Sequence, residues 1–232
     1  EDIYAPFKDK KSSRTSTAIE NGLEPLANII QSMKYSLEEV NKKAKQFLGK
    51  EVINIEDAIA GASDIIAQRY ADDFRTKEVI RNIVLNYGIL ETKKTKTFDE
   101  NGVYVSVANV SEKVKYIKSH RFLAISRAVN EKELTVKIEV DENYILENIK
   151  KYKIPSSASS SKEIVFEAYK NGLKRLLLPS LKREALTQLK DKASSEAITF
   201  FGKNLKELLL TPPLVNQVIL GKETVLQQLF AC

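Results

Sequence analysis

His120 is the only histidine in the chain and the side chain that most readily suggests catalysis. It lies in residues 118–141, KSHRFLAISRAVNEKELTVKIEVD, between a serine and an arginine. General-base catalysis by imidazole requires a nucleophile or a carboxylate at the same site, and nothing in the sequence identifies one. A zinc site requires several histidine or cysteine ligands, and the chain has one of each. We therefore expect no enzymatic activity, no bound metal and no cofactor.

A structural role explains His120 better than a catalytic one. Ser119 has the side chain of a helix cap and precedes the apolar pattern of RFLAISRAV. His120 would then lie in the first helical turn and hydrogen-bond a carbonyl group of a neighbouring loop.

The adjacent carboxylates Asp72 and Asp73 are the next candidates for metal binding. Arg69 and Arg75 lie within one helical turn of them, so ordinary ion pairing is the better interpretation. Neither G-x-x-x-x-G-K-[ST] nor G-x-G-x-x-G occurs, so nucleotide binding has no support either.

Clusters of lysine and arginine are the residues best suited to bind a partner, because cations neutralise nucleic-acid phosphates whatever the base sequence. The chain has 37 basic and 31 acidic residues, a formal net charge of +6. One cluster lies near the amino terminus and another flanks Pro179. The predicted phosphate contacts are Lys8, Lys10, Lys11, Arg14, Lys174, Arg175, Lys182 and Arg183.

Contact through these residues would be weak and indifferent to RNA or DNA sequence, since no aromatic-interleaved motif is present to stack bases. The alternative is that each cluster is a solvated surface. The chain would then be a structural, protein-interaction module without nucleic-acid binding.

Composition places the chain among globular proteins, with 43% hydrophobic residues, 8 glycines and 6 prolines. Its apolar runs are far shorter than the roughly 18 residues that span a bilayer, and no signal segment is evident. We expect a cytoplasmic protein without membrane contact. Cys232 is the single cysteine, so an internal disulfide is excluded.

Apolar spacing predicts a mainly α fold. Residues 1–17 look like an extended basic arm, and Pro25 suits the first turn of a short helix. Ser36 and Glu39 form a capping box for the next helix. Two further helices are expected between residues 55 and 88.

The middle of the chain contains the expected β element. Residues 89–117 allow two interpretations. β-favouring runs on either side of a turn suggest a hairpin, and a helical structure is the alternative. A helix should follow Ser119, then a strand at about residues 133–140. Residues 143–152 look helical again.

The serine-rich residues 155–162 read as a linker between a helical region, 1–154, and a long helical spine, 163–214. Pro179 is expected to kink or restart the spine. Residues 215–232 form a tail.

Five ordered motifs resemble one family, the bacterial transcription accessory protein Tex. They are DIYAPFKDKKSSRTSTAIENGLEPLA, AIAGASDIIAQRYADD, SHRFLAISR, LKRLLLPSLKRE and LLLTPPL, and they span about residues 2 to 214. The chain departs from the Tex pattern at Asp9 and Ser12, where Tex has a proline and an arginine, and at Ala128, where Tex has a glycine.

The resemblance implies a helical scaffold that accompanies nucleic acid and, by extension, the transcription machinery. Tex continues into V-L-G-x-D-P-G, the start of an RNase H-like domain, whereas VILGKETVLQQ lacks the Asp-Pro-Gly. The chain thus resembles an internal fragment without the RNase H-like, helix-hairpin-helix and OB-fold domains. Surfaces such as residues 215–230 would then be exposed and favour self-association.

Overall fold

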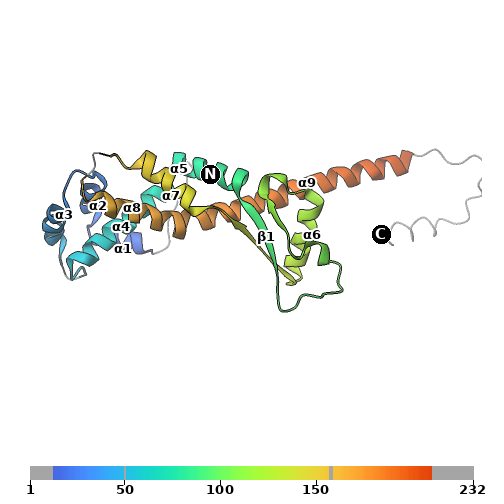
Figure 1. Ribbon diagram of the computed structural model, residues 1–232, viewed down its shortest axis with the longest axis horizontal. Coiled ribbons are helices and arrows are strands. Elements are labelled where there is room, and N and C mark those ends of the chain that lie inside the picture. The colour runs from blue at the N-terminus through green and yellow to red at the C-terminus, as the bar shows by residue number, and fades with distance from the viewer. Residues whose placement is uncertain (1–12, 50, 157–158, 211–232) are drawn as a thin grey trace, which may run out of the picture.

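A helical rod runs along most of the molecule and organises the rest of the fold (Figure 1). The computed structural model describes residues 13–49, 51–156 and 159–210. The rod consists of α8 (Lys162–Gly172), a π-helical segment η5 (Leu173–Leu177) and α9 (Leu178–Leu210). Helices form most of the remaining structure around a small sheet, so the predicted mainly α class is confirmed.

Four helices form the body beside the first part of the rod: α1 (Arg14–Glu20), α2 (Glu24–Gln31), α3 (Leu37–Ala44) and α4 (Ile55–Asp72). Helices α2 and α4 pack on α8, and α1 and α3 pack on α4. The predicted start of α2 at a proline is confirmed. So is the capping box of α3, where the Ser36 amide donates to Glu39 Oε2 over 2.8 Å. Val40 and Ala44 bury the inner face of α3.

The predicted extended arm is wrong for its last residues, which belong to α1. Ser13 and Ser16 form a reciprocal capping box, and Thr15 and Ala18 bury one face of this short helix. A capping box of two serines satisfies the first backbone amides, so a weakly apolar segment can still begin a helix here. Lys8, Lys10 and Lys11 lie outside the described residues.

Helices α4 and α8 cross at very short range because Gly172 lacks a side chain. A Cβ atom at this position would lie 2.5 Å from the carbonyl oxygen of Ala67. Next to this crossing, the rings of Tyr70 and Tyr169 stack with centroids 4.6 Å apart. Burial raises the pKa of both phenols, so both stay neutral in the core between the two helices.

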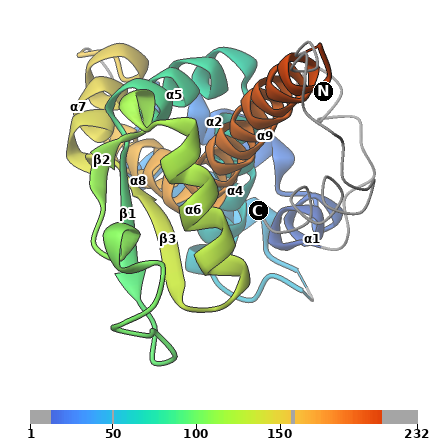
Figure 2. The ribbon, with the colours of Figure 1, turned by 90° about the vertical axis from the view of Figure 1, so that its right-hand side faces the viewer.

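A three-stranded antiparallel sheet with strand order β2-β1-β3 covers the middle of the rod. Helix α5 (Phe74–Tyr87) leads into β1 (Ile89–Lys94), which pairs with β2 (Ser111–Lys113) and β3 (Leu134–Glu139). The hairpin reading of residues 89–117 is therefore confirmed, and so is the strand near 133–140. Seen along the long axis, the sheet and α6 (Ser119–Asn130) lie on one side of α9 and α1 on the other (Figure 2).

The hairpin connection is long and is held from inside by Thr92. The buried Thr92 hydroxyl donates to the Val107 carbonyl over 2.7 Å and accepts from the Val110 amide over 2.8 Å. These bonds satisfy loop backbone groups that would otherwise be buried without partners. They explain how a 3₁₀ turn, Val105–Val107, sits between two paired strands.

The serine-rich segment after α7 (Glu142–Lys153) packs onto the body at its described residues. The Ser159 amide donates to the Met33 carbonyl over 3.0 Å, and Ser161 is fully buried at the start of α8. Core residues before and after this segment, such as Ile66 and Val165, belong to one hydrophobic cluster.

The interruption predicted at Pro179 takes the form of a π-helical turn, Leu173–Leu177, which α9 follows directly at Leu178. Proline cannot donate a backbone hydrogen bond, and a wider turn accommodates the carbonyl groups it leaves without their usual donor. Leu173 and Leu177, within this turn, are both buried. Because a π turn holds more residues than an α turn, it also changes which face of the rod meets the core.

Asp73 caps α5 and connects it to the end of α7. Its carboxylate accepts from the Thr76 amide over 3.0 Å and from Lys153 Nζ over 3.3 Å. Burial alone would raise the pKa of Asp73, but the bonds from Thr76 and Lys153 outweigh it and hold the pKa below its ordinary value. The charged form therefore stabilises the fold.

Replacing Asp73 with alanine is expected to lower the free energy of unfolding by about 1 kcal/mol at neutral pH, the usual cost of a lost helix cap. Since the folded-state pKa is lowered, the contribution is complete well above the unfolded pKa of about 3.9 and is lost as the pH falls through the folded value. Urea unfolding at pH 7 and pH 3 measures this. The matched control is Asp191→Ala, at an exposed position of α9. If the loss of unfolding free energy in Asp73→Ala is as large at pH 3 as at pH 7, the proposed role of the Asp73 carboxylate as a helix cap is wrong.

Candidate nucleic-acid interface

A polar pocket of about 360 Å³ opens beside the π-helical turn, where α4, α5 and the rod meet. Four cationic side chains line it: Lys77 and Arg81 from α5, Arg175 from η5, and Arg183 from α9. Asp72 and Glu184 are the two acids in its wall. The pocket therefore carries an excess of positive charge, which suits a phosphate group.

Two of these cations also hold the rod against its neighbours. Arg81 binds Glu184 through two bonds, Nε to Oε1 at 2.7 Å and Nη2 to Oε2 at 3.2 Å, and so joins α5 to α9. Arg175 Nη2 donates to Asp64 Oδ1 over 2.7 Å and joins η5 to α4. A bidentate arginine-carboxylate pair fixes orientation as well as charge, so the walls of the pocket are well defined.

The structure divides the predicted phosphate contacts into two groups: cations that pair with carboxylates of neighbouring elements, and cations that are exposed to solvent. Lys174 Nζ pairs with Glu142 of α7 at 2.8 Å, and Lys182 Nζ pairs with Glu139 of β3 at 3.6 Å. With Arg175, these residues attach the rod to three other elements. Arg183 is exposed in the pocket, whereas Arg14 lines a different hollow beside α4 and α8.

Sequence reasoning missed Lys77 and Arg81 as members of the basic site. Each is a single cation on the polar face of an ordinary amphipathic helix. Arg81 meets its partner Glu184 across a sequence separation of 103 residues, and no local signal reveals such a contact.

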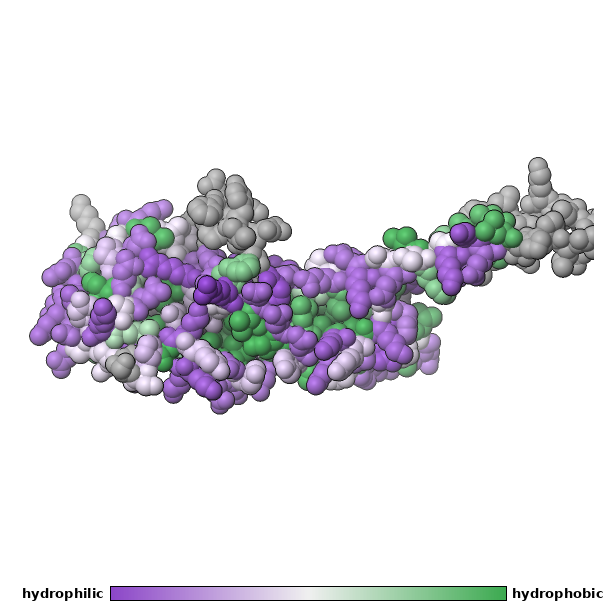
Figure 3. All heavy atoms as spheres, turned by 90° about the horizontal axis from the view of Figure 1, so that it is seen from above, coloured by the Kyte–Doolittle hydropathy of each residue, from purple (hydrophilic) through white to green (hydrophobic). Residues whose placement is uncertain are grey.

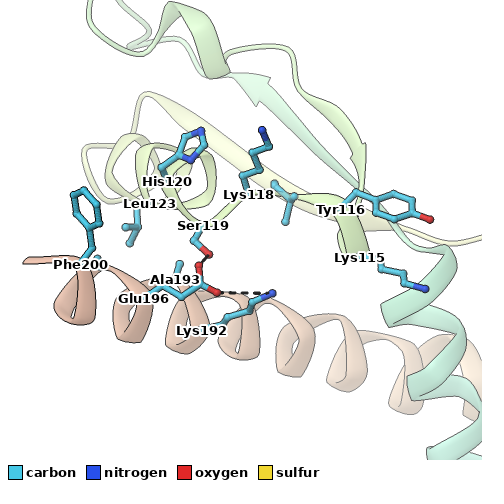
Figure 4. Close-up of a pocket in the computed structure, with 12 residues that line it drawn as sticks. Lys115, Tyr116, Lys118, Ser119, His120, Leu123, Lys192, Ala193, Glu196 and Phe200 are labelled. Atoms are coloured by element: carbon cyan, nitrogen blue, oxygen red, sulfur yellow. Dashed lines mark hydrogen bonds and ion pairs between the residues drawn. The ribbon is translucent and has the colours of Figure 1, made fainter. Parts of the chain in front are cut away.

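The structure corrects the expected helix cap at Ser119. Lys118 occupies the cap position of α6 and provides no side-chain cap bond, while the Ser119 hydroxyl donates to the Glu196 carboxylate of α9. Figure 4 shows His120 on α6 with its ring turned away from α9. Since His120 is exposed and no hydrogen bond of its ring occurs among the described residues, the expected carbonyl contact is wrong as well.

Replacing His120 with glutamine is therefore expected to change the free energy of unfolding by less than about 0.5 kcal/mol, as is usual for exposed positions. Thermal or urea unfolding of both proteins measures the difference. A loss above about 1 kcal/mol would show that the imidazole has a structural partner.

The acidic pair makes ordinary contacts, as expected, but Asp73 pairs with Lys153 at 3.3 Å. Asp73 caps α5, and Asp72 accepts from Gln68 Nε2 over 3.0 Å. Arg69 pairs instead with Glu24 of α2 at 2.7 Å. Over the described ranges, no group of three histidine, cysteine, aspartate or glutamate side chains is arranged to hold a metal ion.

Comparison with known proteins identifies the family. A family model described as Tex central region-like matches residues 37–201, from α3 to the distal part of α9. The chain belongs to the Tex family. The resemblance stated from the sequence motifs is thus confirmed.

Three relatives illustrate the range of similarity to this Tex central region. Protein YdcI of Bacillus subtilis is 33% identical over 225 residues, 95% of this chain and 31% of the relative. The transcriptional accessory protein Tex of Neisseria gonorrhoeae is 28% identical, and the match covers 95% of this chain and 30% of the relative. The human S1 RNA-binding domain-containing protein 1 is 27% identical, and the match covers 95% of this chain and 23% of the relative.

The Tex central region described here spans less than a third of the length of these curated relatives. None of the helices in the described part of the chain is long and apolar enough to cross a membrane.

Proposed function

We propose that this chain is the nucleic-acid-associated helical scaffold of a Tex-like transcription accessory protein. In this proposal it acts by positioning and binding in the cytoplasm and catalyses no reaction. The names of two relatives support the association, since one is a transcriptional accessory protein and another contains an S1 RNA-binding domain. The rod supports the scaffold role because it connects helices, sheet and its own projecting end in one continuous element.

The observation that carries the proposal is the convergence of Lys77, Arg81, Arg175 and Arg183 on one pocket from two separate parts of the chain. A phosphate there would be met by several cations that the fold already holds in place. Contact should nevertheless be weak, because Arg81 and Arg175 already bind carboxylates that compete with a phosphate. The dissociation constant is expected in the non-specific range, about 10⁻⁴ to 10⁻⁶ M.

Fluorescence anisotropy with labelled single-stranded RNA and duplex DNA at about 50 and 200 mM salt tests the proposal. We expect both polymers to bind through their phosphates, and binding to weaken steeply as salt rises. The double variant Lys77→Gln, Arg183→Gln should bind more weakly at low salt and lose affinity less steeply, since fewer counterions are released. The matched control is Lys93→Gln, Lys137→Gln, two exposed lysines on the sheet.

A protein-interaction module is the second candidate, and the projecting end of α9 favours it. Figure 3 shows hydrophobic side chains on the part of α9 that extends beyond the body. Large apolar residues exposed toward this end are Ile198, Phe201, Leu205, Leu208, Leu209 and Leu210. Such a surface favours a protein partner or self-association. A chain that binds neither polymer at low salt but sediments as a dimer would support this candidate against the first.

A further inference from the structure

A groove of about 810 Å³ runs between α9 and the segment that leads into α6 (Figure 4). It is separate from the polar pocket at Pro179 and shares no lining residue with it. Its wall from Lys192 to Phe200 spans eight helical steps, about 12 Å at 1.5 Å per step. A ligand in this groove would therefore have to be elongated.

The groove has a small-residue floor and an aromatic ring at either end. Ala193 and Ala197 of α9 and Leu123 of α6 line it without filling it. Phe200 is 67% exposed and Tyr116 is 64% exposed. Figure 4 shows them at opposite ends of the groove. Lys115 Nζ lies 6.0 Å from the centroid of the Tyr116 ring, so the other face of that ring and the Phe200 ring are left for planar groups of a ligand.

The charge of the groove is positive. Its single acid, Glu196, accepts from the Ser119 hydroxyl and lies 4.0 Å from Lys192 Nζ, so its charge is already balanced. Lys115 and Lys118 form no ion pair with any carboxylate in the part of the chain that the structure describes. Both cations are exposed on the rim and are available to an anionic ligand.

We propose that this groove is a second binding site, which takes single-stranded nucleic acid by stacking bases on Phe200 and Tyr116. Phosphates between the stacked bases would lie near Lys115 and Lys118. Stacked nucleotides rise about 3.4 Å each, so the 12 Å wall accommodates about three of them. The site goes beyond the proposed phosphate contacts at Pro179, because here the bases themselves contribute and paired bases in a duplex cannot reach the rings.

An extended peptide suits the groove less well. It would bring main-chain amides that need partners, and the walls are mainly helices whose backbone groups already pair within each helix. Bases make no such demand, since their faces stack on aromatic rings and their edges can stay in water.

Binding of labelled dT12, rU12 and an abasic oligomer of the same length to the complete chain tests the proposal. We expect dT12 and rU12 to bind at least tenfold more tightly than the abasic oligomer, which keeps the phosphates but has no bases to stack. The double variant Phe200→Ala, Tyr116→Ala should lose this advantage and bind all three oligomers alike. A preference for rU12 over dT12 would identify RNA as the source of the ligand.

Two other exposed aromatics give matched controls. Phe201 follows Phe200 on α9 and is also 67% exposed, but it does not line the groove. Tyr152 is 72% exposed and lies beneath Lys151, as Tyr116 lies beneath Lys115. The variant Phe201→Ala, Tyr152→Ala should keep the preference for bases.

Three results would overturn the groove site. They are equal affinity for dT12 and the abasic oligomer, an unchanged preference in the Phe200→Ala, Tyr116→Ala variant, and an equal loss in the control variant. If all oligomers bind equally and salt weakens them steeply, the phosphate contacts of the proposed function stand while the groove site fails. If no oligomer binds at low salt, both proposals fail together.

Discussion

Replacing Gly172 with alanine is expected to reduce the free energy of unfolding by about 3 kcal/mol, the upper range for overpacking a filled core. The added methyl group would meet the carbonyl oxygen of Ala67 at 2.5 Å, and a backbone atom cannot rotate away as a side chain can. Helices α4 and α8 would have to separate, which also disturbs the stacked Tyr70 and Tyr169 rings. Urea unfolding followed by circular dichroism measures the loss.

The same substitution at Gly202 is the matched control, since this glycine lies inside α9 and its Cβ would meet no atom within 4 Å. Alanine there should stabilise the protein by about 0.5 to 1 kcal/mol, because it favours the helix and restricts the unfolded chain. Equal effects at the two positions would contradict the close crossing of α4 and α8.

Neutralising the amino-terminal cluster is expected to have the largest effect on nucleic-acid binding. The variant replaces Lys8, Lys10, Lys11 and Arg14 with glutamine. If each contacts one phosphate of single-stranded RNA, the slope of log K against log salt falls by about 3, at about 0.7 per phosphate. Between 50 and 200 mM salt the unmodified chain should then lose about 50-fold more affinity than the variant does. Anisotropy titrations at several salt concentrations give both slopes.

A control must remove the same charge from another surface, since net charge alone affects binding. Lys93, Lys96, Lys113 and Lys137 are four exposed lysines on and beside the sheet. Their replacement by glutamine should change the slope little. Equal losses in the two variants would mean that only the overall charge attracts nucleic acid, without phosphate contacts in the amino-terminal cluster.

Signals that act within one helical turn predicted much of the fold. The proline in the first turn of α2 and the Ser36–Glu39 box before α3 both mark helix starts in the structure. Each satisfies or terminates backbone hydrogen bonds locally, so the sequence alone is enough to recognise it. The period-two pattern of β3 is equally local.

Features that depend on distant partners were not predictable in the same way. Ser119 looks like a cap, but its partner Glu196 lies 77 residues later on α9. Lys174, Arg175 and Lys182 look like a free basic cluster, although three acids from α7, α4 and β3 meet them. A charge pattern reports which residues are ionised, but only the fold decides whether each cation faces solvent or a carboxylate.

Helices α4 and α8 lie far apart in the sequence although they touch in the fold, and this order affects synthesis on the ribosome. Arg175 and its partner Asp64 are 111 residues apart, so the inner face of α4 is made long before the helix that covers it. At about 5 to 20 residues per second, the interval is roughly 6 to 20 seconds. During that time the surface around Ala67 has no native cover from α8, and a nascent chain would depend on chaperones or on non-native contacts to keep it from aggregating.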